Sequence, residues 1–286
     1  MSGHGSQETV RRLRWPEALV VAHRGASGYL PEHTLESYAL SAGMGADFLE
    51  PDVVLTRDHV PICLHDIHLE RVTDVNRRFP GRAREDGRFY ALDFSLDEVR
   101  SLSATGGQRH GMRGLQIPTF EEMIAMTRHL ESRLGPIGIA PEIKSPSFHQ
   151  SAGAPIVRIV ADVLKASGHA SDPSRCIVQS FESGALVELR RDHGVTATLL
   201  ELLSGDAPSP TELDAIAKRA GAIGPPKAMI EATSGQLVND AHAFGLAVIP
   251  YTFGEDEAET RRFYRDYGVD GLFSDFTDVA VRARDH

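Results

Sequence analysis

The chain has 286 residues, of which 41% are hydrophobic and 24% are charged, and its formal net charge at pH 7 is −10. This length and apolar fraction suit a full core in one α/β barrel or two small domains. The acidic balance argues against a general binder of nucleic acid or of anionic membranes, because such surfaces are usually basic. Cys63 and Cys176 are its only cysteines, too few for a disulfide framework.

No run in the sequence approaches the ~18 apolar residues that a membrane helix needs, so we expect no stable membrane insertion. The first 18 residues include a basic cluster with no long apolar core behind it. Such a segment does not have the pattern of a signal peptide. We therefore expect a soluble chain, cytoplasmic as written, or periplasmic or extracellular if an export signal has been removed.

Apolar runs alternate with amphipathic stretches along the chain. Short apolar runs followed by Gly or Pro turns predict buried strands, and a 3.6-residue period predicts helices. The predicted strands are 19–23, 48–55, 137–143, 176–181, 195–200, 221–224, 246–251 and 269–274. The predicted helices are 35–44, 119–134, 156–166, 184–192, 211–220, 234–244, 256–267 and 276–283. Strand–helix alternation repeated in this way, in a chain near ~250 residues, favours a (β/α)8 TIM barrel over an open sheet.

One region departs from this alternation. After the second strand, 60–65 predicts a hairpin return, and 74–118 is rich in Arg, Gly and aromatic residues with one short helical patch near 96–102. We interpret 74–118 as an insertion in a single barrel domain that spans residues 1–286. Long insertions in compact domains are often lids or binding loops.

Three carboxylates fall where a barrel places its active site, at the carboxyl ends of strands. Glu50 and Asp52 lie two residues apart on one predicted strand and so point to the same face. Two carboxylates on one face of a buried strand repel each other unless they are protonated or bridged by a cation. A lone Glu-x-Asp is more often a solvated edge or a salt bridge, but Glu142 ends the third strand in the same way. Three such groups predict an oxygen-only site for a hard divalent cation, Ca²⁺ or Mg²⁺, rather than zinc.

Other polar or aromatic side chains also lie at or just after the predicted strand ends: His23, Arg24, His65, Lys144, Phe181, Glu201, Tyr251 and Asp275. Taken singly, each has a common structural explanation, since a histidine can be satisfied in a core and a lysine usually lies at the surface. Cys63 is expected to be an inert buried thiol, and the Arg-rich stretch 77–88 a solvated loop. Their coincidence at strand ends makes an active site the favoured interpretation.

Five short motifs appear in this order: His23-Arg24-Gly25, Pro31-Glu32-His33-Thr34, Glu50-Pro51-Asp52-Val53, His65-Asp66 and Glu142-Ile143-Lys144. This set resembles the pattern of the glycerophosphodiester phosphodiesterases. The resemblance continues through 71–74, 79–102, 179–181 and 270–275, so it covers nearly the whole chain, and the 71–102 region is similar to a branch of secreted bacterial enzymes. His33 replaces a commoner Asn, and Tyr251 stands where many members carry Trp. Both departures are expected to affect substrate preference more than chemistry.

The resemblance implies hydrolysis of small-molecule glycerophosphodiesters, such as glycerophosphocholine or glycerophosphoethanolamine, to sn-glycerol 3-phosphate and an alcohol. It assigns acid–base catalysis to His23 and His65, with the order of the two roles open. The expected metal ligands are Glu50, Asp52 and Glu142, and the expected substrate-binding residues are Arg24, Lys144 and Tyr251.

Physical chemistry independently agrees with this assignment, because a phosphodiester anion repels nucleophiles until its charge is neutralised. A cation, an Arg fork and a Lys point charge supply that neutralisation, and imidazole titrates near neutral pH. Attack by the substrate's own hydroxyl through a cyclic phosphate and direct attack by water both fit the residues.

Three alternatives remain at this point. A phospholipase D-like barrel could act on lysophospholipids or sphingolipids, and an exposed apolar rim or lid would favour it. A metal-free phosphoinositide-specific phospholipase C shares the fold and the paired histidines, but the carboxylate triad argues against it. A non-catalytic glycerophosphodiester-binding protein would need no acid–base pair, so His23 and His65 argue against that class.

Overall fold

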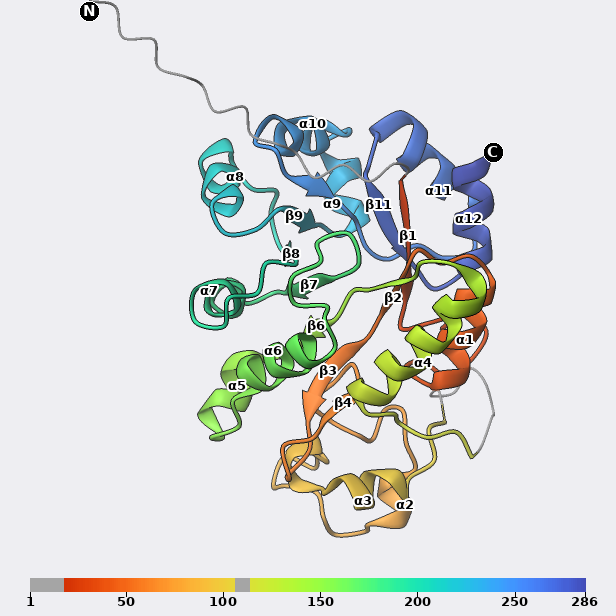
Figure 1. Ribbon diagram of the computed structural model, residues 1–286, viewed down its shortest axis with the longest axis vertical. Helices are drawn as coiled ribbons and strands as arrows, with labels where there is room; N and C mark the ends of the chain where they lie inside the picture. The colour runs from red at the N-terminus through yellow and green to blue at the C-terminus, as the bar shows by residue number, and fades with distance from the viewer. Residues whose placement is uncertain (1–17, 106–113) are drawn as a thin grey trace, which may run out of the picture.

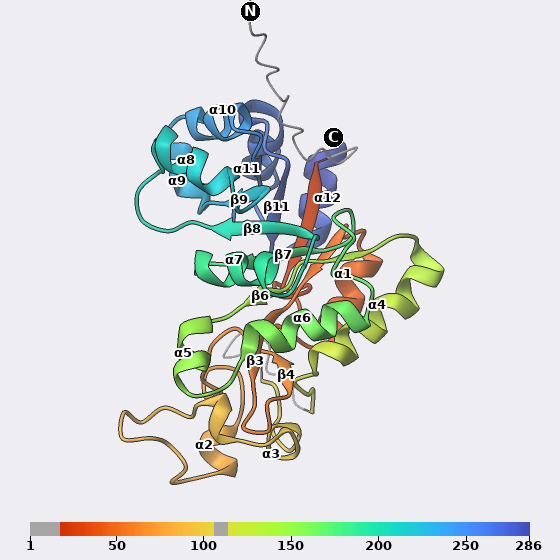
Figure 2. The same cartoon turned by 60° about the vertical axis from the view of Figure 1, so that its left-hand side comes forward.

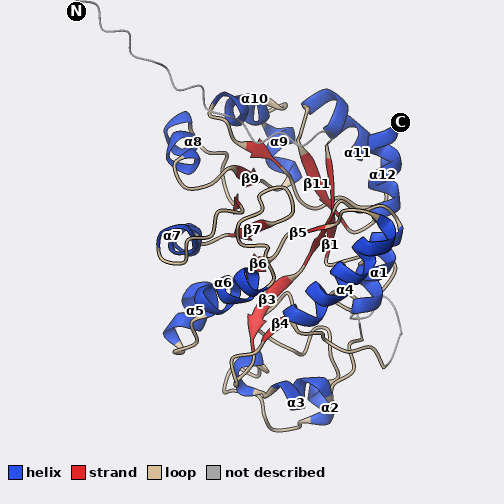
Figure 3. Cartoon of the chain, in the orientation of Figure 1, coloured by secondary structure: helices blue, strands red, loops and turns tan. Residues whose placement is uncertain are grey.

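A ring of parallel strands, surrounded by helices, forms the body of the molecule (Figures 1 and 3). The structure is a computed structural model that describes residues 18–105 and 114–286. Two segments lie outside the described residues: 1–17, which contains the basic cluster, and 106–113 of the predicted insertion.

Two hydrogen-bonded sheets make up the ring. The first has the order β11 (Gly271–Ser274), β1 (Leu19–His23), β2 (Phe48–Glu50) and β5 (Gly138–Ile139). The second has the order β10 (Ala247–Val248), β9 (Ala222–Gly224), β8 (Thr198–Leu202), β7 (Ile177–Ser180), β6 (Glu142–Ile143), β3 (Asp52–Leu55) and β4 (Pro61–Cys63). Parallel bridges from Ile139 to Cys176 and from Phe253 to Ser274 join the sheets. These pairings confirm the predicted (β/α)8 barrel.

Two predicted strands are each broken at a proline. Pro51 separates β2 from β3, and Pro141 lies between β5 and β6. Proline has no backbone N–H to donate to a ladder, so the continuous strands predicted for 48–55 and 137–143 were wrong at these points. Because of the breaks, β2 pairs with β1 and β5, whereas β3 pairs with β4 and β6.

Helices cover the outside of the ring (Figure 3). Near the predicted positions lie α1 (Leu35–Gly43), α4 (Phe120–Leu134), α6 (Ile156–Ala166), α7 (Ser183–Arg191), α8 (Pro210–Ala217), α10 (Gln236–Ala243), α11 (Glu257–Arg262) and α12 (Thr277–Asp285). A π-helical turn, Phe263–Tyr267, continues α11. Thr34 caps α1 as predicted, because its side chain accepts a hydrogen bond from the Ser37 amide. Two short helices outside the predicted insertion were not predicted, α5 (Pro146–Ser151) and α9 (Lys227–Ala232).

The fifth barrel strand lies later in the chain than the predicted 195–200. Because β8 extends to Leu202, Glu201 lies within the strand instead of following it. Its carboxylate accepts hydrogen bonds from Arg219 Nε at 2.6 Å and Nη2 at 2.7 Å. Glu201 therefore belongs to a separate ion pair, and the expectation that it lies with the other strand-end residues was wrong.

The region after β3 forms a small unit at one end of the barrel (Figures 1 and 2). It contains β4, α2 (Val75–Arg78), a 3₁₀ turn (Ala91–Asp93) and α3 (Leu96–Arg100). Its own apolar cluster includes Leu64, Leu69, Val72, Phe94 and Val99, so this packing begins earlier in the chain than residue 74. Tyr90 of this unit stacks on Phe148 of α5, with ring centroids 5.5 Å apart. That 74–118 acts as a lid or binding loop stays a prediction.

Among the helices of residues 18–105 and 114–286, none is both long enough and apolar enough to cross a membrane.

Candidate active site

Strand register assembles the predicted carboxylates. His23 pairs with Glu50 across β1 and β2, and Asp52 pairs with Glu142 across β3 and β6. Glu142 in turn pairs with Gln179 of β7. His23 and Glu50 end β1 and β2, whereas Asp52 and Glu142 begin β3 and β6, directly after the proline breaks that follow β2 and β5.

Glu50, Asp52 and Glu142 are buried, with 2%, 1% and 7% of their surface exposed. Each offers an oxygen that lies within 4.8 Å of the other two. Asp52 Oδ1 is buried and, among the described residues, has no hydrogen-bond partner. Three clustered carboxylates with an unsatisfied oxygen fit a hard divalent cation, which takes oxygen ligands.

Two cationic side chains flank this triad. Lys144 Nζ lies 2.8 Å from Glu142 Oε1 and 3.6 Å from Asp52 Oδ1. Arg24 Nε lies 3.3 Å from Asp52 Oδ2, and the Arg24 backbone amide donates to Glu50 Oε2 at 2.7 Å. The structure thus brings both predicted phosphate-binding cations against the three predicted metal ligands.

The carboxylates differ in how strongly they hold a proton. Burial raises the pKa of Glu50 well above its ordinary value, and the Asp52 charge raises it further. Burial and the same charge raise the pKa of Glu142 to about 8. Burial alone would also raise the pKa of Asp52, but Lys144 and His33 outweigh it and hold that pKa well below its ordinary value. Asp52 is therefore the carboxylate that the protein's own cations keep ionised, whereas a further cation would favour ionisation of the other two.

His23 is oriented by a carboxylate from the last strand of the barrel. Its Nδ1 donates to Asp275 Oδ1 at 2.6 Å, and that oxygen also accepts from Ser27 Oγ at 2.8 Å. A carboxylate acceptor places the ring proton on Nδ1, which leaves Nε2 for a ligand. Burial lowers the pKa of His23 and the Arg24 charge lowers it further, against the opposing effect of Asp275.

His65 is oriented in the same way by the next residue in the chain. Its Nδ1 donates to Asp66 Oδ1 at 2.7 Å. Burial would raise the pKa of Asp66, but the hydrogen bonds from His65 and Arg71 hold it well below its ordinary value. His65 thus also presents Nε2 as the nitrogen available to a ligand.

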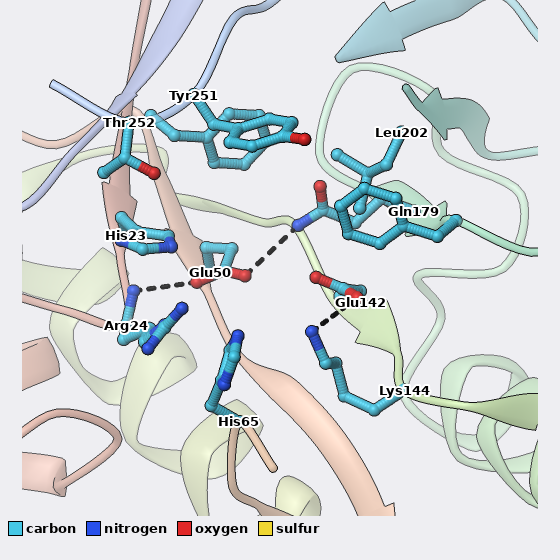
Figure 4. A pocket seen from close by; sticks show the side chains of 12 residues that line it. His23, Arg24, Glu50, His65, Glu142, Lys144, Gln179, Leu202, Tyr251 and Thr252 are labelled. Carbon is cyan, nitrogen blue, oxygen red and sulfur yellow. Dashed lines mark hydrogen bonds and ion pairs between the residues drawn. The ribbon is translucent and has the colours of Figure 1, made fainter. Parts of the chain in front are cut away.

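A pocket of about 190 Å³ lies over this cluster. The residues that line it are His23, Arg24, Glu50, His65, Glu142, Lys144, Gln179, Phe181, Leu202, Tyr251, Thr252 and Phe273. Figure 4 shows the two histidines, Arg24 and the acidic groups around one space, with the Tyr251 ring above them. The Tyr251 hydroxyl donates to the Leu203 carbonyl oxygen at 2.7 Å, so the tyrosine offers a ligand its ring. The pocket contains all the predicted site residues except Asp52, which lies buried against Lys144 and Arg24.

Several residues of the site had no predicted role there. His33 is buried, and its Nε2 lies 2.8 Å from Asp52 Oδ2 and its Nδ1 2.7 Å from the Tyr38 hydroxyl. It therefore contacts a carboxylate of the triad and does not line the pocket, and an effect on substrate preference stays a prediction. Gln179 donates through Nε2 to Glu50 Oε1 at 3.3 Å and to the Ala140 carbonyl at 2.9 Å. The signal for it in the sequence was its place in the 179–181 segment of the family resemblance, near the end of a predicted strand.

Comparisons with known proteins agree with this geometry. The model of the glycerophosphoryl diester phosphodiesterase family matches residues 23–279. A glycerophosphodiester phosphodiesterase of Haemophilus influenzae is 30% identical over 98% of this chain and 93% of its own length. One from Bacillus subtilis is 30% identical over 91% of this chain and 84% of its own length.

A solved structure also shares the architecture. It is a phosphodiesterase of Oleispira antarctica in complex with the product sn-glycerol-3-phosphate. It is 26% identical with a TM-score of 0.75, and the match covers 94% of this chain and 98% of that one. On the family match and the similarity of sequence along nearly the whole chain, this protein belongs to the glycerophosphoryl diester phosphodiesterase family.

Proposed function

We propose that this phosphodiesterase hydrolyses glycerophosphodiesters, such as glycerophosphocholine and glycerophosphoethanolamine, to sn-glycerol 3-phosphate and an alcohol, with the help of a divalent cation. One observation carries the proposal. Two carboxylate-oriented histidines, His23 and His65, line the same pocket as two cations and a buried acidic triad. The sn-glycerol-3-phosphate bound by the O. antarctica phosphodiesterase supports the glycerol half of the substrate.

Charge neutralisation is the first requirement of the reaction. Glu50, Asp52 and Glu142 would hold Ca²⁺ or Mg²⁺, which when bound neutralises negative charge on the phosphodiester. Arg24 contributes a planar fork of donors and Lys144 a point charge, and both line the pocket. Because Lys144 contacts Glu142 and Asp52, its ammonium is held within reach of a ligand at the triad.

Proton transfer is the second requirement. We assign it to the Nε2 atoms of His23 and His65, because each Nδ1 is committed to an aspartate. One histidine takes a proton from the attacking group, and the other gives a proton to the departing alkoxide. Attack by water gives sn-glycerol 3-phosphate directly, whereas attack by the substrate's own hydroxyl gives a cyclic phosphate that water then opens. Tyr251 is proposed to contact the substrate through its ring, at the upper wall of the pocket (Figure 4).

A chelation and add-back assay across a panel of glycerophosphodiesters tests the proposal. Protein stripped with a chelator should lose turnover, and titration with Ca²⁺ or Mg²⁺ should restore it, with sn-glycerol 3-phosphate measured as product. Calorimetric titration of the same ions should give one site in the wild type and none in Glu142→Gln. Glu212→Gln, at a surface carboxylate outside the pocket, is the matched control. Full activity after exhaustive chelation would overturn the metal requirement, and absence of turnover across the loaded panel would overturn the substrate class.

A further inference from the structure

Arg71 lies between β4 and α2 and does not line the pocket, yet it contacts two carboxylates that hold pocket residues, Asp66 and Glu32. Its Nε donates to Asp66 Oδ2 at 2.5 Å, while the other oxygen of Asp66 accepts from His65. Its Nη1 and Nη2 donate to Glu32 Oε2 at 3.0 Å and Oε1 at 2.6 Å. Glu32 Oε1 also accepts from Arg24 Nη1 at 3.2 Å. These contacts join His65 to Arg24 through one guanidinium.

The shape of the arginine side chain explains why this residue type stands here. Arg71 uses three nitrogens in one plane to bind two carboxylates at once, a geometry that an ammonium cannot reproduce. The side chains of Glu32 and Asp66 are 16% and 25% exposed, so neither carboxylate is fully compensated by water. Burial would raise the pKa of Glu32, but Arg71 and Arg24 lower it to about 2, so Glu32 stays ionised between the two arginines.

The apolar cluster of the insertion fixes the backbone that carries Arg71. Leu69 and Val72 are buried in that cluster, with 0% and 4% of their surface exposed. The Thr73 amide donates to the Leu69 carbonyl at 3.1 Å, and its hydroxyl donates to the same oxygen at 2.7 Å. The guanidinium therefore stands on a packed turn, so its position depends on the insertion's core.

We propose that Arg71 is a positioning residue for hydrolysis. It holds Asp66 so that His65 presents Nε2 to the pocket, and it pairs with Glu32 so that the Arg24 guanidinium stays available to the phosphodiester. The role in turnover rests on the proposed function. Without Arg71, Asp66 loses the donor that fixes its second oxygen, and Glu32 has Arg24 as its remaining cation partner in this network. Arg24 would then be drawn toward Glu32 and be less available to a phosphate.

The first experiment is a double-mutant cycle on the full chain loaded with its divalent cation. Arg71→Met should lower kcat/KM by about 10- to 100-fold, as expected for hydrogen bonds to charged groups, and Arg71→Lys should recover only part of it. The effect on kcat should vanish in a His65→Ala background, because Arg71 then has no histidine to position. A merely structural role would lower kcat by the same factor in both backgrounds.

Arg77→Met is the matched control, because Arg77 also pairs with an aspartate but lies at the surface, away from the pocket. It should leave kcat and KM within twofold of the wild type. Exogenous methylguanidinium should restore part of the activity of Arg71→Ala, since the native side chain is 42% exposed and its site is open to solvent. Activity of Arg71→Met within twofold of the wild type, or an equal loss in both backgrounds, would overturn the proposal.

A binding measurement separates this proposal from the proposed function. Calorimetric titration with sn-glycerol 3-phosphate needs no turnover and directly measures the binding to which Arg24 is proposed to contribute. Arg71→Met should weaken that binding by roughly 10-fold while the affinity for the divalent cation is unchanged, because Arg71 touches no carboxylate of the triad. A wild type that hydrolyses no glycerophosphodiester overturns the proposed function alone, whereas unchanged sn-glycerol 3-phosphate binding in Arg71→Met overturns the role given to Arg71.

Discussion

His23 and His65 make the same hydrogen bond with an aspartate, at 2.6 Å and 2.7 Å, but different parts of the fold hold the two pairs. His23 and Asp275 are 252 residues apart in sequence and meet because β1 pairs with β11. His65 and Asp66 are neighbours in the chain, on the segment that leads from β4 into the insertion. Arg71, in the same segment, donates to the second oxygen of Asp66.

The two pairs also differ in their contact with solvent. The His23 side chain is 17% exposed, and that of His65 is 30% exposed. His23, held by the closed barrel, is therefore less exposed than His65, which lies on the segment between β4 and α2. A change in the insertion should therefore disturb His65 and leave His23 in place.

Removal of either imidazole should have the largest effect. His23→Ala and His65→Ala should each lower kcat by about 10²- to 10⁴-fold, because a positioned acid or base is lost, while cation binding stays nearly intact. Steady-state kinetics and calorimetric metal titration measure the two quantities. His129→Ala, on the exposed side of α4, is the matched control. Near-normal turnover in either variant would show that the role assigned to that histidine is wrong.

A change of leaving group should then distinguish acid from base. A p-nitrophenol leaving group needs little protonation, so the variant that lacks the general acid should regain roughly 10²-fold or more relative to an ethanolamine diester. The variant that lacks the general base should lose the same factor on both substrates. Equal recovery of His23→Ala and His65→Ala would contradict the division of roles between the two residues.

Loss of the aspartate charge should have a smaller and unequal effect. Asp275→Asn and Asp66→Asn should each lower kcat by about 10- to 100-fold, as for partners that orient functional groups. The loss should be larger for Asp275→Asn, because the more buried His23 has less water to replace its acceptor. Steady-state rates for the two Asn variants, with Asp275→Glu and Asp66→Glu as conservative variants, measure this difference. A larger loss in Asp66→Asn would reverse the comparison.

A cavity in the insertion should have the smallest effect on turnover. Leu69→Ala and Leu213→Ala both empty a fully buried site, the first in the insertion's cluster and the second in the main barrel core. Each should lower the free energy of unfolding by about 2 to 5 kcal/mol. A several-fold loss of kcat should accompany only Leu69→Ala, because that residue supports the turn that carries Arg71. Denaturant unfolding and kinetics on the same preparations test this pair, and an equal loss of kcat would remove the link.

Local patterns were enough to predict the barrel and most of the site's residue types. Alternating apolar runs and helical periods located the strands and helices to within a few residues, since burial imposes those periods directly on the sequence. Glu50, Asp52 and Glu142 could be grouped because strands of a barrel end at one face. The short helices α2, α5 and α9 were missed, because their few residues carry little periodic signal.

Pairings between distant segments were decided only by the tertiary structure. The His23–Asp275 bond depends on closure of the barrel, and the placement of His33 behind Asp52 depends on how the β1–α1 turn folds back. In the sequence, Arg71 stood out only as the start of the 71–74 segment of the family resemblance, and the packed fold placed it between Glu32 and Asp66. By itself, the sequence determined which chemical groups are present and which strand ends carry them. Register and packing decided which groups touch, because a hydrogen bond needs a distance and a direction that residue spacing along the chain does not define.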